Sequence, residues 1–151
     1  MANDTTRFVY VTYIRTTPEK LWAALTQPEF TKQYWFGVTM KSGWKAGADW
    51  QMMYDDGRVM DAGSIVEADA PRRLVIKWRN EWKPEFKAEG YSRCTMEIEQ
   101  TADSVKLSVT HEMDVANSGF INEGVSNGWP KILSNLKSLL ETGSVLMAEK
   151  V

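Results

Sequence analysis

Apolar and polar side chains alternate along the middle of the chain, from Val38 to Asp114. Successive side chains of a β-strand point to opposite faces, so this alternation predicts strands with one apolar and one polar face. The clearest run places Val105, Leu107, Val109, His111 and Met113 opposite Lys106, Ser108, Thr110 and Glu112. Turn-forming residues at 43–47, 55–57 and 69–71 separate the runs, as expected for an antiparallel sheet.

Helical spacing replaces the alternation near the C-terminus. The apolar side chains there recur three and four positions apart: Trp129, Ile132, Leu133, Leu136, Leu139 and Leu140. The polar residues between them, Asn135 among them, are predicted to face outward, and Gly143 suits the end of the helix. Pro130 either lies in the first turn of a helix that begins near Asn127 or kinks a longer helix from Gly119, and we favour the longer helix. Residues 147–151 are expected to be loosely attached.

The N-terminal part predicts a strand followed by two short helices. Phe8–Ile14 is rich in β-branched and aromatic residues, which favours a strand. Thr17 and Pro18 suit the cap and first position of a helix, and Gln27-Pro28 separates it from a second short helix over 29–33. A sheet with one apolar face needs a cover, and the C-terminal helix is the element able to supply it. The predicted fold is therefore α+β, a curved antiparallel sheet wrapped around a long C-terminal helix in one domain over residues 1–151.

Charge and apolar-run length exclude two classes of partner. The chain has 18 basic and 20 acidic residues and no basic block, which argues against a nucleic-acid partner. Its apolar runs are far shorter than the ~20 residues of a membrane span. The first residues are polar and acidic, unlike a secretory signal, so we expect a cytoplasmic protein. The single cysteine, Cys94, permits no internal disulfide.

Large apolar side chains are unusually frequent: seven Trp, five Tyr, five Phe and eight Met in 151 residues. Flat rings leave irregular spaces and methionine adapts to varied shapes, so this composition fits a ligand pocket as well as a solid core. The motifs of nucleophilic, zinc-dependent and nucleotide-binding enzymes do not occur. His111, Asp61 and Arg93 are the candidates for proton transfer, although a histidine on an apolar face is more simply a satisfied core residue. We expect no metal and no cofactor.

Three segments carry a resemblance to a known family. Residues 16–35, TTPEKLWAALTQPEFTKQYW, residues 57–78, GRVMDAGSIVEADAPRRLVIKW, and residues 128–141, GWPKILSNLKSLLE, resemble the family named after the activator of the Hsp90 ATPase. This family is part of the START-like, or Bet v 1-like, superfamily. The resemblance implies the helix-grip fold, in which sheet and helix often enclose a cavity; members bind lipids, sterols or polyketides, cyclise polyketides, or act as protein partners.

The resemblance implies a cavity between the sheet and the long helix. We expect it to be lined by Trp35, Phe36, Trp50, Met52, Met60, Trp78, Trp82, Met96, His111, Met113, Phe120 and Trp129. The segment 80–90 is expected to form either a lid or an exposed hairpin. The first hypothesis is a protein that binds a small apolar or amphipathic ligand as a monomer or homodimer. The alternatives are a protein-interaction module with a chaperone or other protein partner, and a polyketide cyclase-like enzyme.

Overall fold

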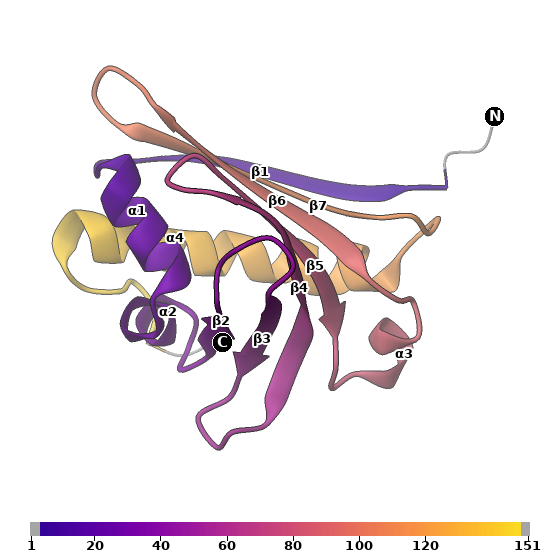
Figure 1. The fold of residues 1–151 in the computed structure, drawn as a ribbon. Helices are drawn as coiled ribbons and strands as arrows, with labels where there is room; N and C mark the ends of the chain where they lie inside the picture. Colours follow the sequence, from indigo (N-terminus) through magenta and orange to yellow (C-terminus); the bar gives the residue numbers. More distant parts are fainter. Residues whose placement is uncertain (1–3, 149–151) are drawn as a thin grey trace.

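A seven-stranded antiparallel sheet forms the body of the computed structural model, which describes residues 4–148 (Figure 1). Its strand order is β1-β7-β6-β5-β4-β3-β2, so β1 and β2 are the two edges. The strands are β1 (Thr6–Ile14), β2 (Thr39–Ser42), β3 (Asp49–Met53), β4 (Val59–Asp69), β5 (Arg73–Asn80), β6 (Ser92–Gln100) and β7 (Val105–Met113). The helices are α1 (Pro18–Thr26), α2 (Pro28–Tyr34), α3 (Pro84–Lys87), the π-helical turn η1 (Phe120–Val125) and α4 (Ser126–Thr142).

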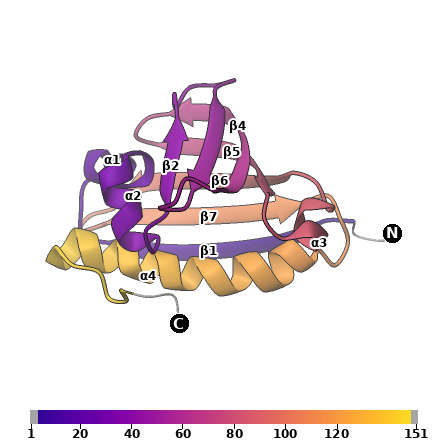
Figure 2. The same cartoon turned by 90° about the horizontal axis from the view of Figure 1, so that it is seen from below.

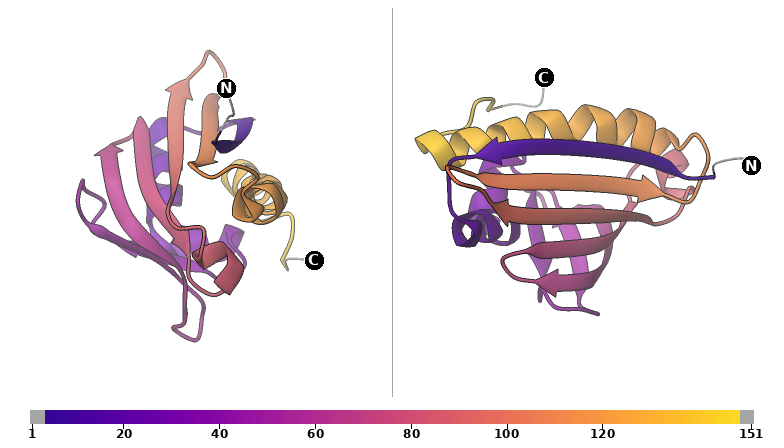
Figure 3. Two further views of the ribbon diagram at one scale, coloured as in Figure 1. Left: turned by 90° about the vertical axis from the view of Figure 1, so that its right-hand side faces the viewer. Right: turned by 90° about the horizontal axis from the view of Figure 1, so that it is seen from above.

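The sheet curves around α4, which lies in its hollow (Figure 3). Seen from below, β2, β3 and β4 turn away from the flatter part formed by β1 and β7, and α1 and α2 close one end (Figure 2). The alternating apolar positions of β7 are all buried, as the sequence pattern predicts. This arrangement confirms the expected helix-grip fold. No helix among the described residues is long and apolar enough to cross a membrane.

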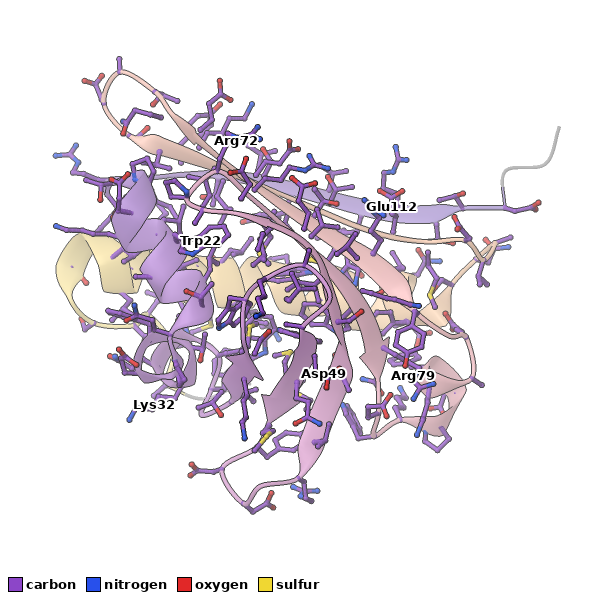
Figure 4. All side chains as sticks on the ribbon, in the orientation of Figure 1. Trp22, Lys32, Asp49, Arg72, Arg79 and Glu112 are labelled. Atoms are coloured by element: carbon purple, nitrogen blue, oxygen red, sulfur yellow. The ribbon has the colours of Figure 1, made fainter. Side chains whose placement is uncertain are left out.

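The two short helices are fixed to each other and to the core. Thr17 accepts a hydrogen bond from the Lys20 amide at 3.2 Å, which is the predicted N-cap of α1. The buried Tyr34 hydroxyl at the end of α2 donates to the Ala24 carbonyl at 2.9 Å, which ties α2 to α1. Trp22, labelled on α1 in Figure 4, is half-buried and packs against the core. The pair therefore holds the residue after α2, Trp35, at the sheet–helix junction.

Gly63 on β4 allows two tryptophans to meet. It is paired in register with Trp50 on one side and Trp78 on the other. Because glycine has no side chain, the two indole rings approach to 4.5 Å between centroids. A Cβ atom at position 63 would lie 1.7 Å from the Lys77 carbonyl oxygen, so the close approach of β4 and β5 also requires glycine.

The C-terminal helical segment begins at Phe120, in agreement with the longer of the two predicted helices, and Pro130 lies inside α4. Asn135 was predicted to face outward from the helix, and this prediction is wrong, because its side chain is completely buried. Its amide donates to the Met147 carbonyl at 2.8 Å, and its carbonyl accepts from the Met147 amide at 2.7 Å. The expected loose attachment is thus wrong for Met147, and residues 149–151 of that prediction lie outside the described residues.

Candidate functional site

An aromatic recess opens between the sheet and the start of the C-terminal helical segment. We call it the inner recess, and its cavity volume is about 90 Å³. Its walls come from the residue that follows α2, from β4, β5, the segment after β5 and β7, and from η1 and α4. The lining residues are Trp35, Met60, Asp61, Trp78, Asn80, Trp82, Phe86, His111, Phe120, Gly124, Val125, Gly128, Trp129 and Ile132.

The rings of the inner recess pack against one another. Trp35 contacts Trp129 with centroids 5.1 Å apart and Trp78 at 6.1 Å. Trp78 also lies 5.0 Å from the ring of His111. Each aromatic pair of this kind contributes about 0.5–1.5 kcal/mol beyond its buried area. The recess is consequently a small space within a well-packed aromatic cluster that joins sheet and helix.

His111 is fully buried in the wall of the inner recess, and hydrogen bonds fix its tautomer. The indole N–H of Trp129 donates to His111 Nδ1 at 3.1 Å, so Nδ1 carries no proton. In the neutral ring the proton is then on Nε2, which lies 2.8 Å from the Ser92 hydroxyl oxygen. The Ser92 hydroxyl donates in turn to the Trp78 carbonyl at 2.9 Å.

This hydrogen-bond chain argues against proton transfer by His111. Burial lowers its pKa to about 3, so the ring is neutral at physiological pH. Its basic lone pair on Nδ1 is already engaged by Trp129. A general base needs such a lone pair within reach of the substrate's proton. The geometry favours the simpler interpretation, a core histidine satisfied by its neighbours.

The other two candidates for proton transfer lie on opposite faces of the sheet. Asp61 reaches the inner recess from β4 with 3% of its surface exposed, and the indole N–H of Trp78 donates to its Oδ2 atom. Arg93 is exposed on β6, where it stands in register between Lys77 and Glu112 on the polar face. The structure therefore brings Asp61 and His111 to one recess but separates Arg93 from both.

A second depression, which we call the outer groove, adjoins the inner recess. It has a volume of about 450 Å³ and shares Trp35, Met60 and Trp82 with the recess. Its other lining residues are Phe36, Val38, Tyr54 and Ala148. Trp82 lines both spaces and is 52% exposed. The three shared residues place the two spaces next to each other.

The segment after β5 forms a wall of the recess, which argues against one of its two expected forms, the exposed hairpin. It contains α3, whose Phe86 is buried and packs edge-on against Phe120 at 5.7 Å. The Glu89 carboxylate accepts from the Gly119 amide at 3.0 Å and from the Ser118 hydroxyl at 2.5 Å. The negative charge of Glu89 at the N-terminal end of η1 also interacts favourably with the helix dipole. Glu89 thus anchors the segment to η1.

Seven of the twelve expected cavity residues line the inner recess: Trp35, Met60, Trp78, Trp82, His111, Phe120 and Trp129. Phe36 lines the outer groove instead. The remaining four, Trp50, Met52, Met96 and Met113, are packed into the core and line neither space. Sequence reasoning missed Phe86, because it stands in a charged segment with no periodic pattern. It also missed Asn80, although this residue ends β5 and continues the alternation of Leu74, Ile76 and Trp78. It also missed the small helix residues Gly124 and Gly128.

A larger depression of about 840 Å³ lies elsewhere, over β2 to β5 and Tyr91. Its lining includes the exposed Lys41, Asp49 and Lys77 together with the buried Trp50. Tyr91 beside it is covered by Lys77 and by Arg79, each 4.7 Å from the ring centroid; Figure 4 labels Asp49 and Arg79. Ligand sites are typically apolar concavities, so we consider the aromatic recess the better candidate site. Residues 4–148 contain no cluster of three His, Cys, Asp or Glu side chains suited to a metal.

Comparison with known proteins identifies the relatives of this chain. The model of the family described as Activator of Hsp90 ATPase homolog 1-like protein matches residues 15–141. No curated protein sequence matches the chain significantly. Many solved structures do match it.

Three solved structures illustrate the likeness. A Mesorhizobium loti protein is 24% identical, with a TM-score of 0.75, over 89% of this chain and 96% of its own. A protein described as an Aha1 dimer from Colwellia psychrerythraea is 16% identical, with a TM-score of 0.72, over 91% of this chain and 98% of its own. CalU16 from Micromonospora echinospora is 19% identical, with a TM-score of 0.71, over 92% of this chain and 78% of its own. At these identities the likeness establishes the shared fold.

Proposed function

The chain belongs to the family of Activator of Hsp90 ATPase homolog 1-like proteins, and on this premise we propose that it binds a small apolar or amphipathic molecule between sheet and helix. The observation that carries the proposal is the inner recess, an aromatic-walled space that also presents Asp61 and Asn80. Ligand sites are typically apolar concavities with a few polar groups that orient the ligand. The binding energy would come from burial of apolar surface, worth about 25 cal/mol per Å².

The two adjoining spaces suggest how such a ligand would lie. The inner recess, at about 90 Å³, is smaller than the roughly 300–1,000 Å³ typical of sites for drug-sized ligands. The outer groove, which shares three lining residues with the recess, has about 450 Å³. We therefore expect a small head group in the inner recess and a larger apolar part in the outer groove, covered by Trp82 and Met60.

A second candidate function is protein interaction, as in an Hsp90-activator-like module. It is favoured by the small volume of the interior and by the outer face of the edge strand β1, where Val9, Val11 and Tyr13 are 55%, 44% and 51% exposed. Under this candidate the aromatic cluster would be purely structural. The experiment below separates the two candidates.

The test blocks the inner recess with one substitution on α4. Beside Gly128 there is free space, since the nearest atom to an added Cβ is Ile132 Cδ1 at 3.9 Å. Gly128→Leu would therefore fill the recess, and it also replaces a poor helix former. Native mass spectrometry of the purified protein, before and after incubation with a library of lipids and aromatic compounds, measures the bound mass. We expect an added mass that disappears on denaturation and is lost in Gly128→Leu.

The matched control is Asn127→Leu, which adds the same side chain at the neighbouring exposed position of α4. It should bind as the unaltered protein does. Binding that survives in Gly128→Leu would show that the ligand lies elsewhere. A bare mass in every sample would instead favour the protein-interaction candidate.

A further inference from the structure

The side-chain amide of Asn80 is only half satisfied by the protein. Asn80 ends β5, is 5% exposed and lines the inner recess. Its side-chain oxygen accepts a hydrogen bond from the Lys83 backbone amide at 2.9 Å. Because a backbone N–H can only donate, this bond fixes which end of the Asn80 amide is the oxygen. The NH2 group at the other end forms no hydrogen bond within residues 4–148.

The bond to Lys83 does not account for this NH2 group. It uses only the oxygen, which aspartate at the same position would also supply. Asn80 also continues the buried alternation of Ile76 and Trp78, where the strand pattern favours an apolar side chain. A buried donor without an acceptor costs free energy, because the group has lost its hydrogen bonds to water. A ligand in the recess that accepted from this group would remove the cost.

Two indole N–H groups at the same spaces also lack an acceptor from the protein. Trp35 and Trp82 line both the inner recess and the outer groove. Neither indole nitrogen forms a hydrogen bond to another residue in the part of the chain that the structure describes. Polar hydrogens therefore remain available to a ligand from the walls of both spaces.

The acceptor side chains of the inner recess, in contrast, each have a donor from the protein. The Nδ1 atom of His111 accepts from the Trp129 indole at 3.1 Å, and Asp61 accepts from the Trp78 indole. The oxygen of Asn80 is held by Lys83, as described above. The recess is consequently better suited to a ligand that accepts hydrogen bonds than to one that donates them.

The walls also argue against a negatively charged ligand. Among residues 4–148, no lysine or arginine lines either the inner recess or the outer groove. An anion transferred from water into such a site would lose its hydration without gaining a counter-charge. A neutral acceptor avoids this cost.

We propose that the ligand is a neutral carbonyl compound, a ketone or an ester, whose carbonyl oxygen accepts from the Asn80 NH2 group while its apolar body occupies the outer groove. This inference rests on the proposed ligand-binding function and specifies the chemical class of the ligand. The inner recess, at about 90 Å³, suits a group of a few atoms, and the outer groove, at about 450 Å³, suits a ring or chain.

Four probes of one shape separate these chemistries, since each carries a planar three-atom group on a benzene ring. Acetophenone has the carbonyl oxygen, and α-methylstyrene has a CH2 group in its place. Benzoate is an anion, and benzamidinium is a cation with donors only. Affinities are measured by titration, and the Asn80 side-chain NH2 signals are followed by NMR. We expect acetophenone to shift these signals downfield and α-methylstyrene to leave them almost unchanged, with both charged probes binding more weakly than acetophenone.

Asn80→Asp retains an oxygen for the Lys83 amide and removes the NH2 donor. The probes differ in their hydrophobicity, so each affinity is compared with that of the same probe for the unaltered protein. Acetophenone should bind at least about fivefold more weakly to the variant, and α-methylstyrene should change by less than about twofold. The matched control is Asn122→Asp, which makes the same substitution at an exposed position of η1 and should leave both affinities unchanged.

Each outcome has a distinct meaning. If acetophenone binds without moving the Asn80 NH2 signals, or if Asn80→Asp weakens acetophenone and α-methylstyrene equally, the carbonyl inference is overturned while the proposed binding function stands. Tighter binding of benzoate or benzamidinium than of acetophenone overturns it as well. The NMR comparison on the unaltered protein decides the question even if Asn80→Asp does not fold. If no probe perturbs the signals of the recess and Gly128→Leu alters no bound mass, the inference and the proposed function both fall.

Discussion

At His111, the interior of the protein holds an imidazole that cannot easily take up a second proton. Nδ1 accepts from Trp129 and Nε2 faces Ser92, so protonation would break a hydrogen bond and charge a buried ring. Burial lowers the pKa to about 3, against a usual value near 6.5. Between these two pH values His111 is protonated in the unfolded chain but neutral in the folded protein.

The free energy of unfolding should therefore fall as the pH falls through this window. His111 is the only histidine in the chain, and between pH 7 and pH 5 it should remove about 2 kcal/mol of stability. Above pH 7 its contribution should be flat. Urea unfolding at a series of pH values measures this slope, and His111→Gln should flatten it. If the slope persists in that variant, another group is responsible.

Sequence reasoning located His111 on the inner face because the β7 alternation is regular. It could not identify Ser92 and Trp129 as partners, since these residues lie 19 and 18 positions away and meet His111 only through strand pairing and helix packing. The same limit applies to Asp61. Its position in a strand was readable, but its contact with Trp78 depends on the register of β4 against β5.

Strand pairing depends on Gly63, where a side chain has no space on β4. An added Cβ would lie 1.7 Å from the Lys77 carbonyl oxygen, which belongs to the backbone of β5 and cannot rotate away. We expect Gly63→Ala to lower the free energy of unfolding by more than about 3 kcal/mol or to prevent folding. Urea unfolding and the soluble yield measure the effect.

Gly43→Ala provides the matched control. An added Cβ at position 43 would meet only the Ala48 side chain, at an ordinary 3.6 Å, and its backbone is not left-handed. This variant should stay within about 0.5–1 kcal/mol of the unaltered protein. Equal effects at the two glycines would indicate that the sheet relaxes around position 63.

At the level of elements, alternation and helical spacing predicted the strands and the long helix because their buried faces are regular. The short helix α3 escaped prediction, since Phe86 is its single buried residue among charged neighbours. The burial of Asn135 escaped prediction as well. A polar residue normally faces water, and only the return of the chain at Met147 supplies its partners.

Across the whole molecule, four indoles connect both layers. Trp35 follows α2, Trp50 and Trp78 stand on the sheet, and Trp129 lies on α4; all four are buried. Because each contacts another member of this group, separation of α4 from the sheet would expose several rings at once. Docking of helix and sheet and folding of the sheet should accordingly be one cooperative event.

Unfolding followed by tryptophan fluorescence and by far-ultraviolet circular dichroism should give the same midpoint in urea. The fluorescence should shift to the red in a single step. If the fluorescence transition came at lower urea than the dichroism transition, the aromatic cluster would open before the strands separate. Trp82→Phe is a suitable background, because it removes the most exposed indole and leaves the four buried ones with the half-buried Trp22 and Trp44.

The overall architecture was predictable from the sequence. A sheet with one apolar face must bury that face under another element, and the C-terminal helix was the element able to do so. The size of the recess was not predictable. It depends on how the rings of Trp35, Trp78 and Trp129 tilt against one another, and such angles follow from the packing of all neighbours. The family resemblance implied a cavity, and the packing of the large side chains determines how much of it remains open.

The two hydrogen bonds between Asn135 and Met147 have a practical consequence for how the protein is prepared. Asn135 holds Met147 by two hydrogen bonds, and the next residue, Ala148, lines the outer groove. Ala148 is the last residue that the structure describes, so an affinity tag fused after it would be attached close to the candidate site. Such a tag would compete with added compounds or supply a false occupant, so preparations for binding assays should carry a cleavable tag on the N-terminal side.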